Sequence, residues 1–202
     1  AFGAIKVLLM AAILQKSAII FQSYETASFI KIWIFLIIYT WFFYLNFSGY
    51  SDLAIGISRL YGFRLKENFC FPYLRRNISE FWNNWHMSLS RFAQRNAFVP
   101  LGGYRKKTQY IAILGTIFVI ALWHDLSIGM VLFALYHGGG LIAHRYWSDR
   151  QKEKHKKTEG SGNLLINWLK VIATYFFVVL SFPLLVMPLE KAGSFYLALL
   201  GL

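Results

Sequence analysis

Two long apolar stretches stand out in the pattern of hydrophobic and polar positions along the chain. Residues Ile30–Phe47 and Leu164–Met187 each contain a single charged side chain. About 20 apolar residues in helical conformation span the roughly 30 Å hydrocarbon layer of a bilayer. The first stretch predicts a spanning helix over Phe29–Tyr50 that continues as a helix over Leu53–Leu60. The second predicts a spanning helix that ends near Pro188.

The apolar pattern between these stretches is shorter and more broken. Tyr110–Trp123 extends about 21 Å as a helix, which is short of a full crossing, and Leu126–Ile142 is a further apolar helix. Asn77–Asn96 has apolar positions at helical spacing but polar residues on its other face, so it is too polar to face lipid. We predict that this segment dips into the membrane and returns, since re-entrant backbone is tolerated inside a cavity.

Charge gives the expected topology. The chain is 57% hydrophobic and 15% charged, against about 25% charged in soluble domains, and its net charge is +12. Basic residues gather in Arg59–Arg76, Arg91–Lys107 and Arg145–Lys157. Because basic loops stay in the cytoplasm, we expect all three to face that side. No soluble fold with a basic face is indicated, so we expect no nucleic-acid partner.

The predicted fold class is all-α, a multi-pass transmembrane protein with re-entrant helices. We expect residues 1–202 to form a single membrane domain with a charged cytoplasmic loop at residues 148–163. Ala1–Phe21 lacks the pattern of a signal peptide, so we expect the C-terminal part of a longer chain. Cys70 is the single cysteine, which excludes a disulfide framework and a cysteine-based zinc site.

Two histidines are the candidates for acid–base chemistry. His86 and His124 are ionisable groups at the predicted membrane depth, where burial is costly unless a polar cavity or a partner is present. Imidazole exchanges protons near neutral pH, although a histidine that only packs against backbone is an alternative. His137 precedes three glycines and is interpreted as structural. No third ligand accompanies His137 and His144, so no metal site is expected.

Other polar residues have open interpretations. Asp52 could anchor a buried network with Arg59, orient a histidine, or cap the continuing helix. The cations Arg105, Lys106 and Lys107 could meet the phosphate of a donor on the cytoplasmic side, or a lipid headgroup. No nucleophile motif such as G-x-S-x-G and no H-E-x-x-H motif occurs. A histidine pair without a protein nucleophile fits direct transfer, in which a deprotonated hydroxyl attacks an activated acyl carbonyl.

Four sequence runs occur in an order that resembles a known family. They are Asp52–Gly56 (DLAIG), Phe81–Ser90 (FWNNWHMSLS), Pro100–Arg105 (PLGGYR) and Leu122–His124 (LWH). Together they resemble the membrane-bound O-acyltransferase (MBOAT) family, specifically its bacterial polysaccharide-modifying branch, which includes alginate O-acetylation and teichoic-acid D-alanyl transfer proteins. The similarity runs from about residue 47 to residue 147, with a weaker match through the last helix.

The resemblance implies roles for individual residues. His124 matches the family's catalytic histidine, and His86 matches its paired position. The family fold is a ring of membrane helices around a central tunnel, with donor entering from the cytoplasm and acceptor from outside. The family commonly has Gly where this chain has Asp125, and this carboxylate could raise the pKa of the histidine or alter acceptor binding. The residues expected to bind substrate or support the histidines are Trp85, Trp123, Asn84, Asp125 and Asp52.

The sequence therefore predicts an O-acyltransferase of the bacterial cytoplasmic membrane. It would transfer an acetyl group to hydroxyls of an extracytoplasmic polysaccharide, with His124 as general base and with His86 either positioning the acyl carbonyl or supporting His124. No cofactor is expected to stay bound, and acetyl-CoA or an acyl-carrier-protein thioester would be the co-substrate. The expected partners are lipids, a polysaccharide or cell-wall polymer, a carrier protein and an extracytoplasmic transferase. The alternatives are D-alanyl transfer from a carrier-protein thioester, a proton-coupled transporter, and a non-catalytic scaffold.

Overall fold

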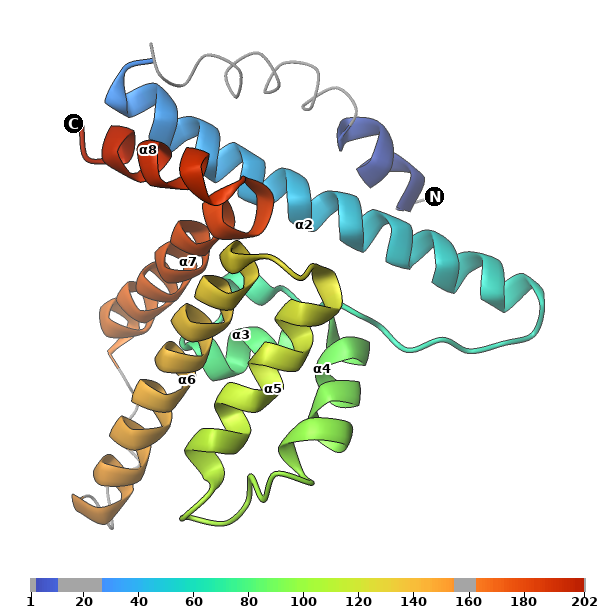
Figure 1. The fold of residues 1–202 in the computed structure, drawn as a ribbon. Coiled ribbons are helices and arrows are strands. Elements are labelled where there is room, and N and C mark those ends of the chain that lie inside the picture. The colour runs from blue at the N-terminus through green and yellow to red at the C-terminus, as the bar shows by residue number, and fades with distance from the viewer. Residues whose placement is uncertain (1–2, 11–26, 155–162, 202) are drawn as a thin grey trace. The chain divides into compact units, whose positions relative to one another are not determined.

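The computed structural model describes residues 3–10, 27–154 and 163–201 (Figure 1). Within these ranges the regular secondary structure is helical and no strand occurs, which confirms the all-α prediction. The described residues belong to two compact units. Unit 1 combines Ala1–Asn68 with Val186–Leu202, and unit 2 is Phe69–Leu185. The re-entrant path, the central tunnel and the single membrane domain remain predictions.

Unit 1 is built on one long helix. Helix α2, Phe29–Leu60, runs through Ser48 and Gly49 without a break, as the apolar pattern predicted. Helix α8, Leu189–Leu199, packs along it: Trp33 Nε1 donates a hydrogen bond to the Leu199 carbonyl oxygen at 3.1 Å. The buried rings of Phe35 and Phe195 meet edge to face at 6.4 Å. Unit 1 is therefore held by an aromatic helix–helix interface.

Unit 2 contains the predicted pair of shorter helices as an antiparallel hairpin (Figure 1). Its elements are a 3₁₀ turn at Pro72–Leu74, α3 (Ile78–Asn84), α4 (Met87–Ala93), a π-helix (Gln94–Phe98), α5 (Gln109–His124), α6 (Ile128–Lys154) and α7 (Leu164–Val186). Helices α3 and α4 pack against the α5–α6 hairpin, so residues from four helices line the same interior.

Glycines permit the close packing of unit 2. A Cβ atom on Gly138 would lie 2.7 Å from Leu114 Cδ1 of α5, and one on Gly140 would lie 2.5 Å from the Phe177 ring of α7. A larger residue at either site would require the Leu114 or Phe177 side chain to move. The prediction that these glycines allow close helix approach is confirmed.

Two predicted boundaries differ from the structure. Arg145–Lys157 was expected to be a loop, but α6 continues to Lys154. The charged run is helical because it lacks Pro and Gly, and because Arg145 Nε and Asp149 Oδ2 pair at 3.0 Å one turn apart. Residues 148–154 of the expected cytoplasmic loop are thus helical, and residues 155–162 lie outside the described ranges. The second difference is the break of Asn77–Asn96 into α3 and α4 at Trp85 and His86.

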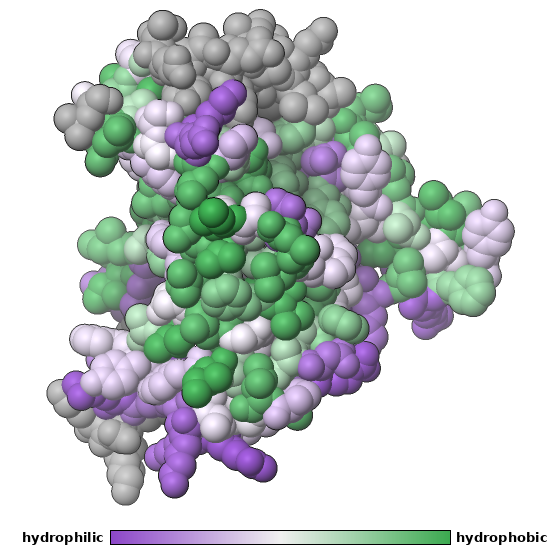
Figure 2. Space-filling model, viewed as in Figure 1, coloured by the Kyte–Doolittle hydropathy of each residue, from purple (hydrophilic) through white to green (hydrophobic). Residues whose placement is uncertain are grey.

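Two described helices, α2 and α7, are long and apolar enough to cross a membrane, and α5 is a shorter apolar helix. Figure 2 shows apolar side chains over the outer face of the α5–α6 hairpin. Hydrophilic side chains gather at the end of unit 2 where α6 ends and α5 begins (Figure 2). This distribution suits a unit whose middle contacts lipid and whose polar end contacts water.

Candidate functional site

His86 lies in a sharp break between two short helices. Asn77 begins α3 with a reciprocal cap, accepting a hydrogen bond from Glu80 N–H at 2.8 Å and donating one to Glu80 Oε1 at 2.7 Å. The helix ends at Asn84, and His86 then adopts a left-handed backbone conformation with φ 42°. For a non-glycine residue this conformation costs about 1–2 kcal/mol. Such strained residues cluster at functional sites.

His124 is the last residue of α5 and lies in the same region as His86. The helix stops there because Asp125 is extended, and the Asp125 N–H still bonds the Ala121 carbonyl oxygen at 3.2 Å. The Trp123 ring contacts both histidines, with centroids 6.3 Å from His86 and 4.9 Å from His124. The structure thus brings the two predicted histidines to one site around Trp123.

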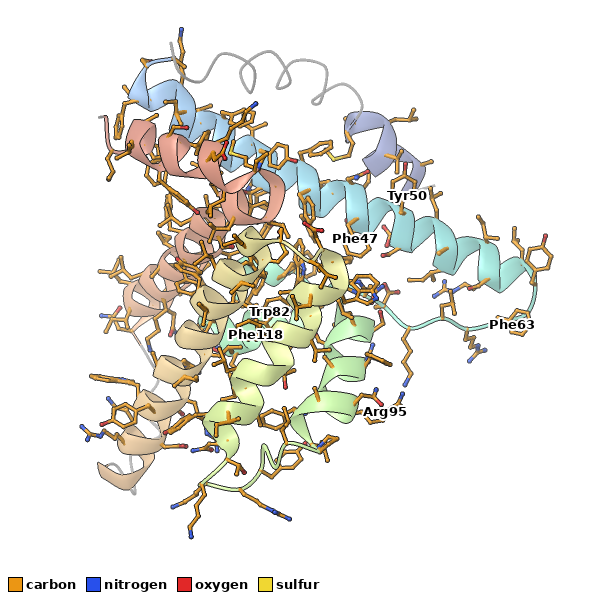
Figure 3. The ribbon with its side chains drawn as sticks, in the orientation of Figure 1. Phe47, Tyr50, Phe63, Trp82, Arg95 and Phe118 are labelled. Carbon is orange, nitrogen blue, oxygen red and sulfur yellow. The ribbon has the colours of Figure 1, made fainter. Side chains whose placement is uncertain are left out.

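A cavity of about 410 Å³ lies inside unit 2. Its apolar wall includes Trp82, which Figure 3 shows among α3, α5 and α6. The polar residues of the lining are Ser79, Asn83, Ser90, Arg91, Gln94, Thr116, His144, Arg145 and Ser148. Met87, which follows His86, and Ile120, one turn before His124, also line it. The cavity therefore has a basic end, formed by Arg91, His144 and Arg145, and a wall that includes sequence neighbours of both histidines.

The predicted supporting residues divide into two groups. Trp123 lies beside both histidines and is 63% exposed, and Asp125, which follows His124, is also exposed. Trp85 instead packs under other rings, 5.5 Å from Phe81 in a stacked arrangement. The amide of Asn84 donates to the Glu80 carbonyl oxygen at 2.8 Å. Trp123 and Asp125 are thus accessible to a substrate, whereas Trp85 and Asn84 hold the backbone around His86.

Asp52 has a different partner from those expected. Its carboxylate accepts from Lys6 Nζ at 2.6 Å, and both side chains are 29% exposed. Residues 3–10 are helical and lie close to α2 here, because a Cβ atom on Gly3 would lie 2.8 Å from the Gly49 carbonyl oxygen. This ion pair lies within unit 1 and fastens residues 3–10 to α2. Of the interpretations of Asp52 that the sequence left open, the ion pair with Lys6 favours a role as a structural anchor.

The basic residues of the cavity are not those that the sequence suggested. Arg105, Lys106 and Lys107 are exposed in the turn before α5 and do not line the cavity. Arg91 and Arg145 do, but they come from α4 and α6, and no sequence spacing signals that they meet. His144 was considered only as a weak metal ligand. Partial burial lowers the pKa of His144 from 6.5, and the carboxylate of Glu80 opposes this shift.

His137 is a packing residue, as its glycine-rich context indicated. It is 1% exposed, and its Nε2 lies 2.9 Å from Ser181 Oγ. Ser181 donates its own proton to the Val178 carbonyl oxygen at 2.7 Å, so Nε2–H of His137 is the donor of the first bond. The Phe133 ring lies 4.4 Å from the imidazole. Among the described residues, no three His, Cys, Asp or Glu side chains group as metal ligands.

Comparison with known proteins identifies the family. The model of the membrane-bound O-acyltransferase family matches residues 1–187. The peptidoglycan O-acetyltransferase of Helicobacter pylori is 35% identical over 137 residues, which are 67% of this chain and 26% of that protein. A probable alginate O-acetylase of Pseudomonas fluorescens is 41% identical over 108 residues, covering 52% of this chain and 22% of that protein.

A third relative has a different named activity. The teichoic acid D-alanyltransferase of Streptococcus thermophilus is 31% identical over 154 residues, which are 69% of this chain and 37% of that protein. The chain thus spans between 22% and 37% of the length of these three relatives. The family match covers most of the chain, including both histidines. The chain belongs to the membrane-bound O-acyltransferase family.

Proposed function

We propose that the protein containing this chain transfers an acetyl group from a cytoplasmic thioester to hydroxyls of an extracytoplasmic polysaccharide. The observation that carries this proposal is the meeting of His86 and His124 around Trp123, from two separate parts of unit 2. The names of relatives, which include a peptidoglycan O-acetyltransferase and an alginate O-acetylase, favour a polymer acceptor and acetyl as the acyl group. The bacterial cytoplasmic membrane is the proposed location.

His124 acts as the general base. Its imidazole takes the proton of the acceptor hydroxyl as the oxygen attacks the thioester carbonyl carbon, and a C–O bond forms. The C–S bond then breaks, and the thiolate leaves with the proton that the imidazolium returns. General-base catalysis of this kind contributes about 10²–10⁴-fold to the rate.

His86 positions the acyl carbonyl. A ring N–H that points to the carbonyl oxygen stabilises the negative charge that develops there during attack. The fixed left-handed backbone of His86 suits this role, because a donor stabilises a transition state best when it is already oriented. Asn in place of His86 would keep a hydrogen-bond donor, which makes it the informative substitution.

The cavity of unit 2 is the proposed donor site. A thioester donor such as acetyl-CoA has an anionic end and a long, weakly polar arm, and the cavity has a basic end and an apolar wall. The anionic end would bind near Arg91, His144 and Arg145, and the arm would extend toward Met87, next to His86. The exposed cations Arg105, Lys106 and Lys107 would contact a carrier protein or lipid headgroups outside the cavity.

Transfer of label tests the proposal. The full-length protein in membrane vesicles is incubated with the polymer and with acetyl-CoA labelled in its acetyl group. The polymer is then treated with mild alkali. We expect labelled acetate to be released from wild-type reactions and from Leu126→Ala, an exposed control near the site, but not from His124→Ala. Near-normal transfer by a well-expressed His124→Ala protein would contradict the mechanism and favour a scaffold that recruits another transferase.

D-alanyl transfer is the second candidate, favoured by the match to a teichoic acid D-alanyltransferase over 69% of this chain. The same assay separates the two. With a D-alanyl carrier-protein thioester as donor, alkali would release D-alanine instead of acetate. Uptake of label without an ester bond to polymer would instead support a transporter.

A further inference from the structure

The loop of residues 69–75, before α3, packs directly against His86. The Phe69 ring lies 5.1 Å from the Trp85 ring and 6.4 Å from the His86 ring. The Cys70 N–H donates to the Asn84 carbonyl oxygen at 3.1 Å, at the point where α3 ends. The loop therefore contacts three consecutive residues, the last of which is the proposed positioning histidine.

The loop is closed on itself by Arg75. The Arg75 guanidinium donates to the Cys70 carbonyl oxygen and lies 3.3 Å from Cys70 Sγ. Between these two residues, Phe71 adopts a left-handed conformation with φ 44°. Within the described part of the chain, Phe71 and His86 are the two non-glycine residues with positive φ. One hydrogen-bonded loop thus links both strained positions.

The far side of the loop is anchored to the body of unit 2. Tyr73 is 4% exposed, stacks on Trp85 at 5.8 Å, and meets the Tyr175 ring of α7 edge to face at 5.3 Å. Movement of the loop would require Tyr73 to leave this packing. The loop is therefore a fixed support against which the Phe69 ring contacts His86.

We propose that this loop positions His86, with Phe69 and Arg75 as positioning residues for acyl transfer. The proposal rests on the proposed function and adds residues that carry no acid–base chemistry of their own. The left-handed conformation of His86 is unfavourable without support, so contacts with its neighbours must maintain it. Phe69 maintains the orientation of the imidazole, and Arg75 maintains the loop that carries Phe69.

Kinetics of single variants test the positioning role. A displacement of about 1 Å in a catalytic group costs up to about 10²-fold in rate, so we expect Phe69→Leu and Arg75→Met to lower kcat about 10-fold. KM for the donor should change less than about twofold. Arg75→Lys should recover part of the loss, because it restores a donor to the Cys70 carbonyl oxygen. Leu74→Ala, an exposed position of the same loop, is the matched control and should retain wild-type kcat.

A double variant shows whether Phe69 acts through His86. Residues that act through one another are not additive, so Phe69→Leu should cost little in a His86→Asn background. A full further 10-fold loss of kcat in that background would overturn the proposal, because Phe69 would then act on something else. Unchanged kcat in the single variants would also overturn it.

Chemical labelling gives a readout without acyl transfer. Diethylpyrocarbonate modifies exposed imidazoles, and peptide mass spectrometry measures the rate at each histidine. Phe69→Leu should change the rate at His86 severalfold and leave the rate at His144 unchanged. If wild-type protein shows no acyl transfer, the proposed function fails and labelling alone decides the positioning role. Equal labelling of His86 in wild type and Phe69→Leu would overturn it.

Discussion

His124 and His137 are two histidines of one compact unit with opposite surroundings. Both contact a tryptophan ring, Trp123 at 4.9 Å in one case and Trp82 at 5.4 Å in the other. His137 is 1% exposed and hydrogen-bonded to Ser181, whereas His124 is exposed at a helix end beside a second histidine. Exposure and a second histidine on the same tryptophan ring make His124 the candidate base, and an aromatic neighbour alone does not distinguish it from His137.

The largest expected effect comes from substitution of the accessible histidine, His124. His124→Ala should lower kcat by about 10²–10⁴-fold, since the base is lost, while the amount of membrane-inserted protein stays at the wild-type level. His86→Ala should cost less, and His86→Asn should retain the most activity. Rates per folded molecule, corrected by quantitative immunoblotting, provide the measurement. If His86→Asn proved as inactive as His124→Ala, a simple positioning role for His86 would be wrong.

Substitution of the buried histidine, His137, should lower the stability of the protein. His137→Ala removes a ring packed 4.4 Å from Phe133 and leaves a cavity, which costs about 2–4 kcal/mol in comparable core truncations. We expect a lower Tm in detergent and less protein in the membrane, with near-normal kcat per folded molecule. Thermal unfolding monitored by tryptophan fluorescence measures this. A wild-type Tm combined with lost activity would reverse the comparison and make His137 part of the catalytic site.

The sequence predicted most of the helices, but not the break at His86 or the helical end of α6. Helix α2 could be predicted because its apolar pattern is long and uninterrupted. The break at His86 could not, because apolar positions continue at helical spacing from Ile78 to Phe92 and no glycine marks the left-handed residue. The helical end of α6 was missed because a run of charges resembles a loop until its ion pair is known.

Some features of the candidate site could likewise be predicted from the sequence, and others could not. Their ionisable side chains at the predicted membrane depth, and then the family resemblance, identified His86 and His124 as candidates. Neither could show that the Trp123 ring contacts both of them. The basic end of the cavity was unpredictable because Arg91 and Arg145 are far apart in the chain, and only the fold brings both of them to the lining of one cavity. Consecutive cations, such as Arg105–Lys107, are easy to see in a sequence, although the structure leaves them outside the cavity.

A third prediction compares these two basic groups. Arg91→Met combined with Arg145→Met should raise KM for acetyl-CoA about 10-fold and weaken its salt dependence, because charged contacts to phosphate are strong and screened by salt. Reversal of Arg105, Lys106 and Lys107 to Glu should change KM for free acetyl-CoA less than the cavity variant does. Steady-state kinetics at two salt concentrations provide the measurement. If reversal of Arg105, Lys106 and Lys107 changed KM more than the cavity variant does, the donor would bind at these three residues, as the sequence suggested.

The smallest expected effect is a pH dependence of donor binding at His144. Partial burial lowers the pKa of His144 from 6.5, so this residue is neutral at pH 7.5 and gains a proton as the pH falls through its lowered pKa. The charged side chains near His144 are Arg91, Arg145, Glu80 and Asp149. The added positive charge should lower KM for an anionic donor about two- to threefold between pH 7.5 and pH 5.5.

His144→Asn separates this effect from titration of the donor. The donor's own phosphate titrates identically with both proteins, so only the difference between the two KM profiles reports on His144. We expect similar KM values at pH 7.5, where His144 is neutral, and a divergence that grows as the pH falls. Parallel profiles down to pH 5.5 would show that His144 does not contact the anionic end. The basic end of the cavity would then consist of the two arginines alone, which the double methionine variant tests independently.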